Sequence, residues 1–310
     1  MIATNNLQGL GVALATPFFP ASGPEDAGAI DLAAFRRLVR HVVGGGTDFL
    51  VVLGSTGEAA TVRADERGAL IAAAREESGG RPVVVGAGHN STSEAVVLAA
   101  QAAAAGADAL LVVTPYYNKP QGAGLEAHFR AVAAAAPGLP IIVYNVPGRT
   151  GLNLLPKDLA RLWTIPQVVA VKESSGNLAQ IGEIARTLPA GKLIFSGDDA
   201  LALPAIAVGA AGLISVAGNV LPAECKALVD AALAGRRDEA CAWHYRLLPP
   251  MDALFLESNP SPLKAALAMM GLGSDALRLP LARASEATRT RIAEVLAVFG
   301  IGTNAAARKS

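Results

Sequence analysis

The sequence predicts an α/β barrel of eight parallel strands, followed by a small helical region. An apolar run followed by a helical stretch occurs eight times in the first 235 residues. The runs are almost continuously apolar, which is typical of parallel strands covered on both faces. No G-x-G-x-x-G turn follows the first run, which disfavours an open doubly wound sheet. We therefore expect a barrel with the active site in residues 1–235, and a helical region with a mobile tail in residues 236–310.

The expected strands are rich in Val, Ile and Leu, and each ends in small or polar residues. They are residues 11–18, 49–55, 82–88, 109–115, 140–146, 168–174, 193–199 and 212–218. Barrel enzymes place their reacting groups where strands end and helices begin, so the polar residues at these eight ends are the candidates for chemistry.

The segments between the runs have helical patterns and helix caps. Asp31 can cap a helix that ends at the glycines of residues 44–46. Ser91 and Glu94 have the spacing of a capping box before an alanine-rich helix. After residue 235 the alternation stops, and prolines divide three further helices. These are expected at residues 236–257, 260–271 and 283–299.

Composition excludes several classes of protein. Hydrophobic residues make up 52% of the chain and charged residues 17%, which excludes a disordered chain. The 26 basic and 26 acidic residues cancel without a polybasic block, so neither nucleic acid nor a membrane is an expected partner. The uncharged stretch 200–223 is interrupted by Gly and Pro and is expected to be a buried helix and strand. Two cysteines and no secretory signal indicate a cytoplasmic protein.

Lys172 is the most informative residue at the strand ends. On a regular strand, Val169 and Val171 share one face while Ala170 and Lys172 share the other. The bulky pair suits the helix side, so Lys172 is expected to point into the barrel. A buried ammonium is costly unless it is paired, and a neutral amine can form imines with carbonyl compounds. The alternative is a strand-end lysine that reaches solvent or pairs with a carboxylate.

Other polar residues at the strand ends fit the same cavity. Tyr144, Tyr117 and Ser55 supply hydroxyls that can pass protons without adding charge, although each tyrosine taken alone is more typical of a packing residue whose hydroxyl finds a partner. The Ser55-Thr56-Gly57 turn can hold a small carboxylate or simply begin a helix. Arg149 can grip a carboxylate, or it can be a solvated surface residue.

Metal and phosphate sites have little support. The histidines, His41, His89, His128 and His244, are scattered without paired spacing, and the two cysteines lack metal-ligand spacing. His89 could reach the cavity, but a structural role is preferred for it. No glycine-rich phosphate loop is present.

Six motifs carry a resemblance to a known family. They are GSTGEAAT (54–61), TPYYNKP (114–120), YNVPGRTG (144–151), VKESSGN (171–177), SGDDALALP (196–204) and FLESNPSPLK (255–264). With them the chain resembles the pyruvate-dependent class I aldolases of the dihydrodipicolinate synthase and N-acetylneuraminate lyase superfamily, from about residue 9 to residue 299. The third and last motifs favour its synthase branch.

The resemblance implies a lyase of lysine and diaminopimelate biosynthesis. Lys172 would form a Schiff base with pyruvate, and the resulting enamine would attack L-aspartate-4-semialdehyde. Tyr144, Ser55 and Tyr117 would relay protons, with Tyr117 crossing a dimer interface into the neighbouring site. The family's substrate-binding positions correspond to Thr56 for the pyruvate carboxylate, Arg149 for the semialdehyde carboxylate, Gly57, Gly197 and the main-chain carbonyl of Ile214. The resemblance implies no cofactor, and a homotetramer built from tight dimers.

Some positions depart from the family pattern. The synthases usually have Thr-Thr where this chain has Ser55-Thr56. Serine also carries a hydroxyl, so the expected proton relay is kept. Asn90, Glu94 and Tyr116 match the site at which some members bind inhibitory lysine. At that site Ala59 and Arg67 replace the usual serine and histidine. Because an added arginine disfavours a cationic ligand, we expect weak or no inhibition by lysine.

Two alternative functions remain open at this point. One is a sister lyase that acts on a keto-deoxy sugar acid or on N-acetylneuraminate; it has less need of a carboxylate-binding Arg149. The other is a barrel that binds a small oxo acid without turnover, as a sensor or structural subunit. The set of Lys172, Tyr144, Tyr117 and Ser55 disfavours that second alternative.

Overall fold

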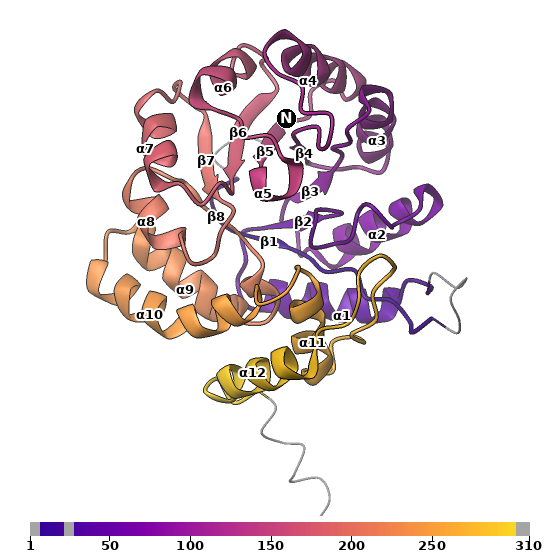
Figure 1. The fold of residues 1–310 in the computed structure, drawn as a ribbon, viewed down its shortest axis with the longest axis vertical. Helices are drawn as coiled ribbons and strands as arrows, with labels where there is room; N and C mark the ends of the chain where they lie inside the picture. The colour runs from indigo at the N-terminus through magenta and orange to yellow at the C-terminus, as the bar shows by residue number, and fades with distance from the viewer. Residues whose placement is uncertain (1–6, 22–27, 302–310) are drawn as a thin grey trace, which may run out of the picture.

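The computed structural model describes residues 7–21 and 28–301, in which eight parallel strands close into a barrel ringed by helices (Figure 1). The strands are β1 (Gly9–Ala13), β2 (Phe49–Val52), β3 (Val83–Gly86), β4 (Ala109–Val113), β5 (Ile141–Asn145), β6 (Val168–Glu173), β7 (Leu193–Ser196) and β8 (Gly212–Ser215). Each pairs with the next, and β8 pairs with β1. All eight expected strands are confirmed. The first runs from Gly9 to Ala13 rather than over 11–18.

Helices follow the strands around the barrel. They are α1 (Leu32–Gly44), α2 (Ala64–Glu77), α3 (Thr92–Ala104), α4 (Ala123–Ala135), α5 (Pro147–Thr150), α6 (Pro156–Leu162), α7 (Leu178–Arg186), α8 (Ala202–Ala207), α9 (Pro222–Leu233), α10 (Arg237–Ala253), α11 (Ser261–Met269) and α12 (Glu286–Ala297). A 3-10 turn, η2 (Ala217–Asn219), follows β8. None of the helices in the described residues is long and apolar enough to cross a membrane.

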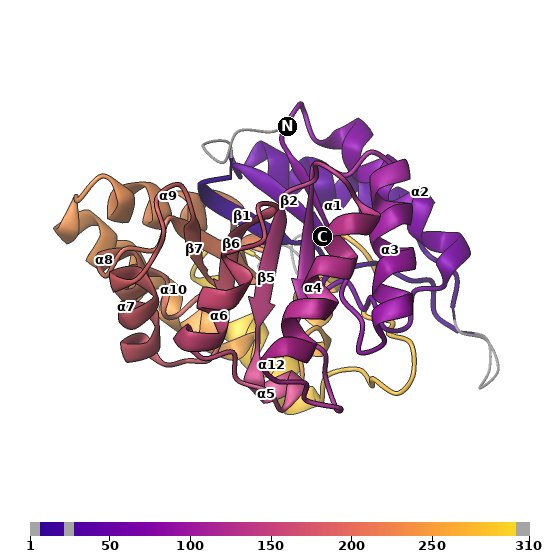
Figure 2. The same ribbon diagram turned by 90° about the horizontal axis from the view of Figure 1, so that it is seen from above.

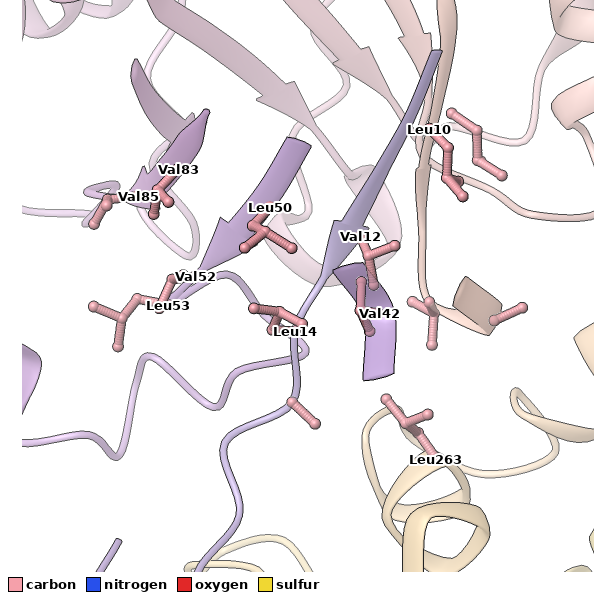
Figure 3. Close-up of a cluster of buried hydrophobic side chains, with 14 of the residues drawn as sticks. Leu10, Val12, Leu14, Val42, Leu50, Val52, Leu53, Val83, Val85 and Leu263 are labelled. Carbon is pink, nitrogen blue, oxygen red and sulfur yellow. The ribbon is translucent and has the colours of Figure 1, made fainter. Parts of the chain in front are cut away.

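Two apolar layers hold the barrel together. Inside, side chains of alternating strand residues pack on one another, with the rings of Phe49 and Phe195 meeting edge to face at 5.5 Å. Gly11 makes room for them, because a Cβ there would lie 2.2 Å from the Phe49 ring. Outside, the larger cluster fills the space between strands and helices and includes Leu10, Val12, Leu14, Val42, Leu50, Val52, Leu53, Val83, Val85 and Leu263 (Figure 3).

Two expectations about local structure need correction. Ile141 pairs with Val168 and Ile142 with Ala170, so β6 carries one extra residue between them. Val169 therefore packs against the inner cluster rather than on the helix side, while the direction expected for Lys172 is unaffected. Ser91 does precede α3, but its side chain makes no capping bond to the helix, and its hydroxyl lies 2.8 Å from that of Ser93. The cap at Asp31 is confirmed, since its carboxylate accepts from the Ala34 amide at 2.8 Å.

The last helices lie outside the ring of barrel helices, on the side where α9 lies (Figure 1). α10 packs on α9 and α12, and α11 packs on α12. Beyond the arrowhead of β5 lie α5 and the yellow C-terminal segment (Figure 2). The three helices expected after residue 235 are confirmed with shorter bounds, and the mobile tail, the last residues TNAAARKS (303–310), lies outside the described residues. The division into two domains at residue 235 stays a prediction.

Candidate active site

A cavity of about 480 Å³ opens at the carboxyl ends of the strands. Its wall combines residues from several strands and loops with residues of the C-terminal helices. Among the lining residues are Ser55, Thr56, Tyr144, Arg149, Lys172, Ser174, Gly197, Asp198, Asp199, Asp252, Phe255 and Asn259. The expected candidates Lys172, Tyr144, Ser55, Thr56, Arg149 and Gly197 therefore meet in one place.

Lys172 projects from β6 into this cavity and is only 4% exposed. Its partner in the ladder is Tyr144 of β5, and the lysine Nζ lies 4.4 Å from the centre of the tyrosine ring. Among the described residues, no carboxylate lies within 4.0 Å of its Nζ. A buried amine beside a phenol and without a counter-ion has the environment of a nucleophile.

The space around the lysine depends on a glycine. A Cβ at Gly197 would lie 2.7 Å from Cε of Lys172 and 1.9 Å from the Ser174 hydroxyl. Any larger residue at the end of β7 would therefore displace the lysine side chain. This explains why a glycine follows β7 and supports the expectation that Gly197 belongs to the site.

A tight turn presents the hydroxyls of Ser55 and Thr56. The backbone of Glu58 at its end has a φ of 53°, in the left-handed region, and its amide donates to the carbonyl of Ser55 at 3.1 Å. The hydroxyl of Thr16 donates to the carbonyl of Gly57 at 2.8 Å. Gly57 thus helps to shape the turn, and its own atoms are not among those that line the cavity.

Asn259 connects this turn to Arg149. Its side-chain amide donates to the hydroxyl of Thr56 at 2.9 Å, and its carbonyl accepts from Nη2 of Arg149 at 2.9 Å. Asn259 is 5% exposed and belongs to the segment before α11. Two polar residues proposed to bind substrate are therefore held by one residue of the C-terminal region.

A buried ion pair supports the same turn from behind. Glu58 and Lys264 of α11 form a salt bridge, and both side chains are almost fully buried. The Lys264 Nζ also donates to the carbonyl of Ala276 at 2.9 Å and lies 4.1 Å from the centre of the Phe18 ring. Burial lowers the pKa of Lys264 to about 8, with the Glu58 carboxylate opposing the shift. Lys264 does not line the cavity, so Lys172 is the buried lysine among the residues that line it.

The ion pair predicts a pH dependence of stability. Since the pKa of Lys264 is about 8 in the folded chain and ordinarily 10.5, the unfolded chain binds more protons between these values. The contribution of Lys264 to the free energy of unfolding should therefore rise as pH rises from about 8 to 10.5. Chemical denaturation of the wild type and of a Glu58→Gln/Lys264→Met double variant, which lacks both charges, measures this contribution. A difference that falls over this pH range would contradict it.

Two more of the expected site residues are not among those that line the cavity of the single chain. Tyr117 is 88% exposed and has a φ of 72°. Ile214 points its side chain into the inner cluster of the barrel. Tyr117 follows Tyr116, whose ring meets that of His89 at 5.9 Å between centroids.

A second cavity, of about 390 Å³, adjoins the first and shares Ser55, Tyr144 and Arg149 with it. Its other lining residues include Ala59, Arg67, His89 and Tyr116. Asn90 and Glu94 lie in the loop after β3 and at the start of α3, outside this lining.

The buried cation in the second cavity is Arg67. It is 5% exposed, and its Nη2 donates to the carbonyl of Gly86 at 2.5 Å. Burial lowers the pKa of its guanidinium. His89, for which a structural role was expected, accepts a hydrogen bond from the Ser91 amide at 3.0 Å.

The sequence reasoning missed two residues. Asn259 lies in the FLESNPSPLK motif, but the motif gave no indication that its segment reaches the barrel mouth. Asp199 is buried against β8, where its carboxylate accepts from the Ser215 hydroxyl and from the Val216 amide at 2.9 Å. Burial raises the pKa of Asp199. It lies in the SGDDALALP motif, and only the folded chain shows its bonds to the end of β8.

The described residues offer no metal site. Within 7–21 and 28–301, no three His, Cys, Asp or Glu side chains are grouped closely enough to hold an ion. The polar groups around Lys172 include hydroxyls, a guanidinium and an amide, which suit oxo-acid substrates.

Comparison with known proteins extends this picture. Residues 6–298 match the model of the dihydrodipicolinate synthetase family. A 4-hydroxy-tetrahydrodipicolinate synthase from Syntrophus aciditrophicus (strain SB) is 44% identical over 291 residues, which are 94% of this chain and 97% of that protein.

Solved structures also match over nearly the whole chain. A dihydrodipicolinate synthase variant described as the first monomeric one matches with a TM-score of 0.91 at 40% identity, over 96% of this chain and 98% of that chain. The chloride-inhibited dihydrodipicolinate synthase from Acinetobacter baumannii, solved in complex with pyruvate, matches with a TM-score of 0.90 at 37% identity, over 95% of this chain and 99% of that chain. These matches include both the barrel and the C-terminal helices.

Proposed function

The chain belongs to the dihydrodipicolinate synthetase family, and on this premise we propose that it condenses pyruvate with L-aspartate-4-semialdehyde to 4-hydroxy-tetrahydrodipicolinate. It is a lyase of lysine and diaminopimelate biosynthesis, and its chemistry runs through a Schiff base. The observation that carries the proposal is the buried amine of Lys172, 4.4 Å from the Tyr144 ring, in a cavity that also holds Arg149.

The first half of the reaction activates pyruvate. The Lys172 amine attacks the C2 carbonyl of pyruvate, and loss of one water leaves a protonated imine. The imine withdraws electrons from the adjacent methyl group, which then gives up a proton and becomes an enamine carbon. Lys172 lines the cavity and is only 4% exposed, so its amine meets the keto acid in the cavity and is largely shielded from bulk water.

The second half makes the carbon–carbon bond and closes the ring. The enamine carbon attacks the aldehyde carbon of the semialdehyde, and the aldehyde oxygen takes up a proton to become a hydroxyl. The amino group of the semialdehyde then attacks the imine carbon and displaces Lys172. The carbon–nitrogen bond to the lysine breaks as the bond to the substrate nitrogen forms, and the enzyme is regenerated.

Hydroxyl groups move the protons in this proposal. Tyr144 faces the lysine across the β5–β6 ladder, and Ser55 lies on the cavity wall beside it. Tyr117 completes the relay from the neighbouring protomer of a tight dimer, which accords with its 88% exposure on the single chain. We propose two such dimers in a homotetramer and place the protein in the cytoplasm.

Two polar residues bind the carboxylates of the substrates. The turn at Thr56 holds that of pyruvate, while Gly57, Gly197 and the carbonyl of Ile214 shape the pocket around it. Arg149 receives that of the semialdehyde, and the carbonyl of Asn259 fixes its guanidinium at the mouth. A fixed guanidinium here favours a second substrate with its own carboxylate over a sugar acid, whose hydroxyl groups need donors and acceptors instead.

A direct assay tests the choice of substrate. Purified protein is incubated with pyruvate and L-aspartate-4-semialdehyde, and product is followed with a coupled reductase. Turnover is expected with this pair, and none is expected in the cleavage of N-acetylneuraminate or of a keto-deoxy sugar acid. Efficient cleavage of a sugar acid with no condensation of the semialdehyde would replace this proposal with the sister lyase.

We also expect the enzyme to be insensitive to lysine. Arg67 brings a buried positive charge to the cavity beside Tyr116, where a cationic amino acid would have to bind. Activity is expected to be unchanged at sub-millimolar lysine, and Arg67→His is expected to increase any lysine binding seen by calorimetry. Half-inhibition of the wild type in the sub-millimolar range would refute this.

A further inference from the structure

Behind Tyr144 and Lys172, a network of buried amides surrounds a single carboxylate. Each catalytic candidate is followed by a residue that faces the other side of the sheet, Asn145 after Tyr144 and Glu173 after Lys172. These two are also partners in the β5–β6 ladder. Asn145 is fully buried and Glu173 is 2% exposed. The reaction proposed above uses neither side chain.

Amide groups satisfy the Glu173 carboxylate. The side-chain amide of Asn145 donates to both of its oxygens, at 2.9 Å to Oε2 and 3.1 Å to Oε1. The Ser175 amide donates to Oε1 at 2.7 Å, and the side chain of Gln180 donates to Oε2 at 3.2 Å. Throughout the part of the chain that the structure describes, no Lys, Arg or His forms a salt bridge with Glu173.

The network joins four pieces of the chain. Asn145 accepts from the Leu154 amide at 2.9 Å, which fixes the orientation of its own amide group. It also donates to Asn153 at 2.9 Å, and Asn153 and Gln180 exchange hydrogen bonds. The ends of β5 and β6, the segment before α6 and the first turn of α7 are therefore tied together at this carboxylate.

The place of this network, at the end of the β5–β6 ladder, matters because the ladder is irregular. The extra residue at Val169 breaks the register below the site, so the regular ladder covers only the upper part of β6. A shift of one residue would turn Lys172 away from the cavity. The bonds of Asn145 and Glu173 hold the last pair of the ladder, and they thereby hold the pair before it, Tyr144 and Lys172.

We propose that Glu173 and Asn145 are positioning residues that keep the Lys172 amine and the Tyr144 ring in reacting geometry. The proposal rests on Lys172 as the imine-forming residue. Because a displacement of about 1 Å can lower a rate about 100-fold, small changes in this network should slow imine formation.

Glu173→Gln is the most informative single change. Asn145 contacts both carboxylate oxygens, so either orientation of the new glutamine amide places its NH₂ group against that of Asn145. Asn145 cannot rotate away without losing the bond from Leu154. Borohydride trapping of pyruvate on Lys172 is expected to be about 10- to 100-fold slower, with a larger loss in kcat than rise in KM.

A second change should rescue the first. Asn145→Asp replaces the conflicting NH₂ with an oxygen that accepts from the glutamine introduced by Glu173→Gln, and the net charge of the network is kept. This oxygen also faces Oδ1 of Asn153, so the side-chain amides of Asn153 and Gln180 must both turn over to pair with it and with each other. The turn loses only the 3.3 Å bond from Gln180 to the carbonyl of Leu154. The Asn145→Asp/Glu173→Gln double variant is expected to trap pyruvate within about threefold of the wild-type rate. A purely structural effect of losing the Glu173 charge would predict no such recovery in the trapping rate.

A carboxylate at the opposite end of the barrel provides the matched control. Asp48 accepts from the Leu10 amide at 2.7 Å, before β2 begins. Asp48→Asn is the same chemical change, and it is expected to lower the melting temperature without slowing trapping.

The outcomes separate the two proposals. If the wild type traps no pyruvate, the proposed function fails. If the wild type traps pyruvate and Glu173→Gln traps it equally fast, or the double variant does not recover, only the positioning role fails. If Glu173→Gln does not fold, Asn145→Ser tests the same contact and is expected to trap about threefold to tenfold more slowly.

Discussion

Replacing Lys172 with alanine is expected to lower kcat at least about 10⁴-fold. Among the described residues that line the cavity, Lys172 supplies the amine that can form a covalent imine, so the enamine cannot form by this route without it. Stability should not suffer, because a buried amine with no counter-ion in the described chain contributes little to folding and the site is already open. The coupled assay measures the loss, and thermal unfolding measures the effect on the fold.

Lys192 provides the matched control for this variant. Its Nζ donates to the carbonyl of Val168, at the start of the same strand that carries Lys172 near its end. Lys192→Met removes a half-buried ammonium far from the cavity, and its kcat is expected to stay within about threefold of the wild type. A Lys172→Ala enzyme that turned over at the control's rate would show that another group starts the reaction.

Replacing Tyr144 with phenylalanine is expected to lower kcat about 10²- to 10³-fold. The ring would keep its packing over Lys172, since the variant lacks only the hydroxyl. Proton transfers during imine formation and ring closure would lose their nearest phenol, and losses of this size are typical of a missing general acid or base. Single-turnover trapping should show the imine forming more slowly, while the melting temperature changes little.

Tyr245 is a suitable control for the missing hydroxyl. It lies on α10 with 68% of its surface exposed, away from the cavity lining. Tyr245→Phe is expected to leave kcat unchanged. Equal losses in both variants, or no loss in Tyr144→Phe, would remove the phenol from the mechanism.

Much of the fold was predictable because strand burial leaves a simple pattern in the sequence. All eight strands were expected, the first of them displaced toward its C-terminal side, since each is a short apolar run buried on both faces. The inward direction of Lys172 was also predictable from alternation near the end of β6. The alternation argument was wrong for Val169, because a bulge adds a residue that periodicity cannot reveal.

The rest of the site depends on contacts between distant parts of the chain. Asn259 meets Thr56 across 203 positions of sequence, and no local pattern encodes that contact. The Glu173 network was hidden for another reason. A glutamate beside a polar turn resembles a solvated strand end until the folded chain buries it. The role of Tyr117 depends on a second protomer, so it stays a proposal.

Reduction of the enzyme with borohydride in the presence of pyruvate, followed by peptide mass mapping, tests the central claim most directly. The account predicts one reduced pyruvate adduct, on the peptide that contains Lys172, and none on Lys264. Absence of any adduct under conditions in which the enzyme is active, or an adduct on a different lysine, would contradict it.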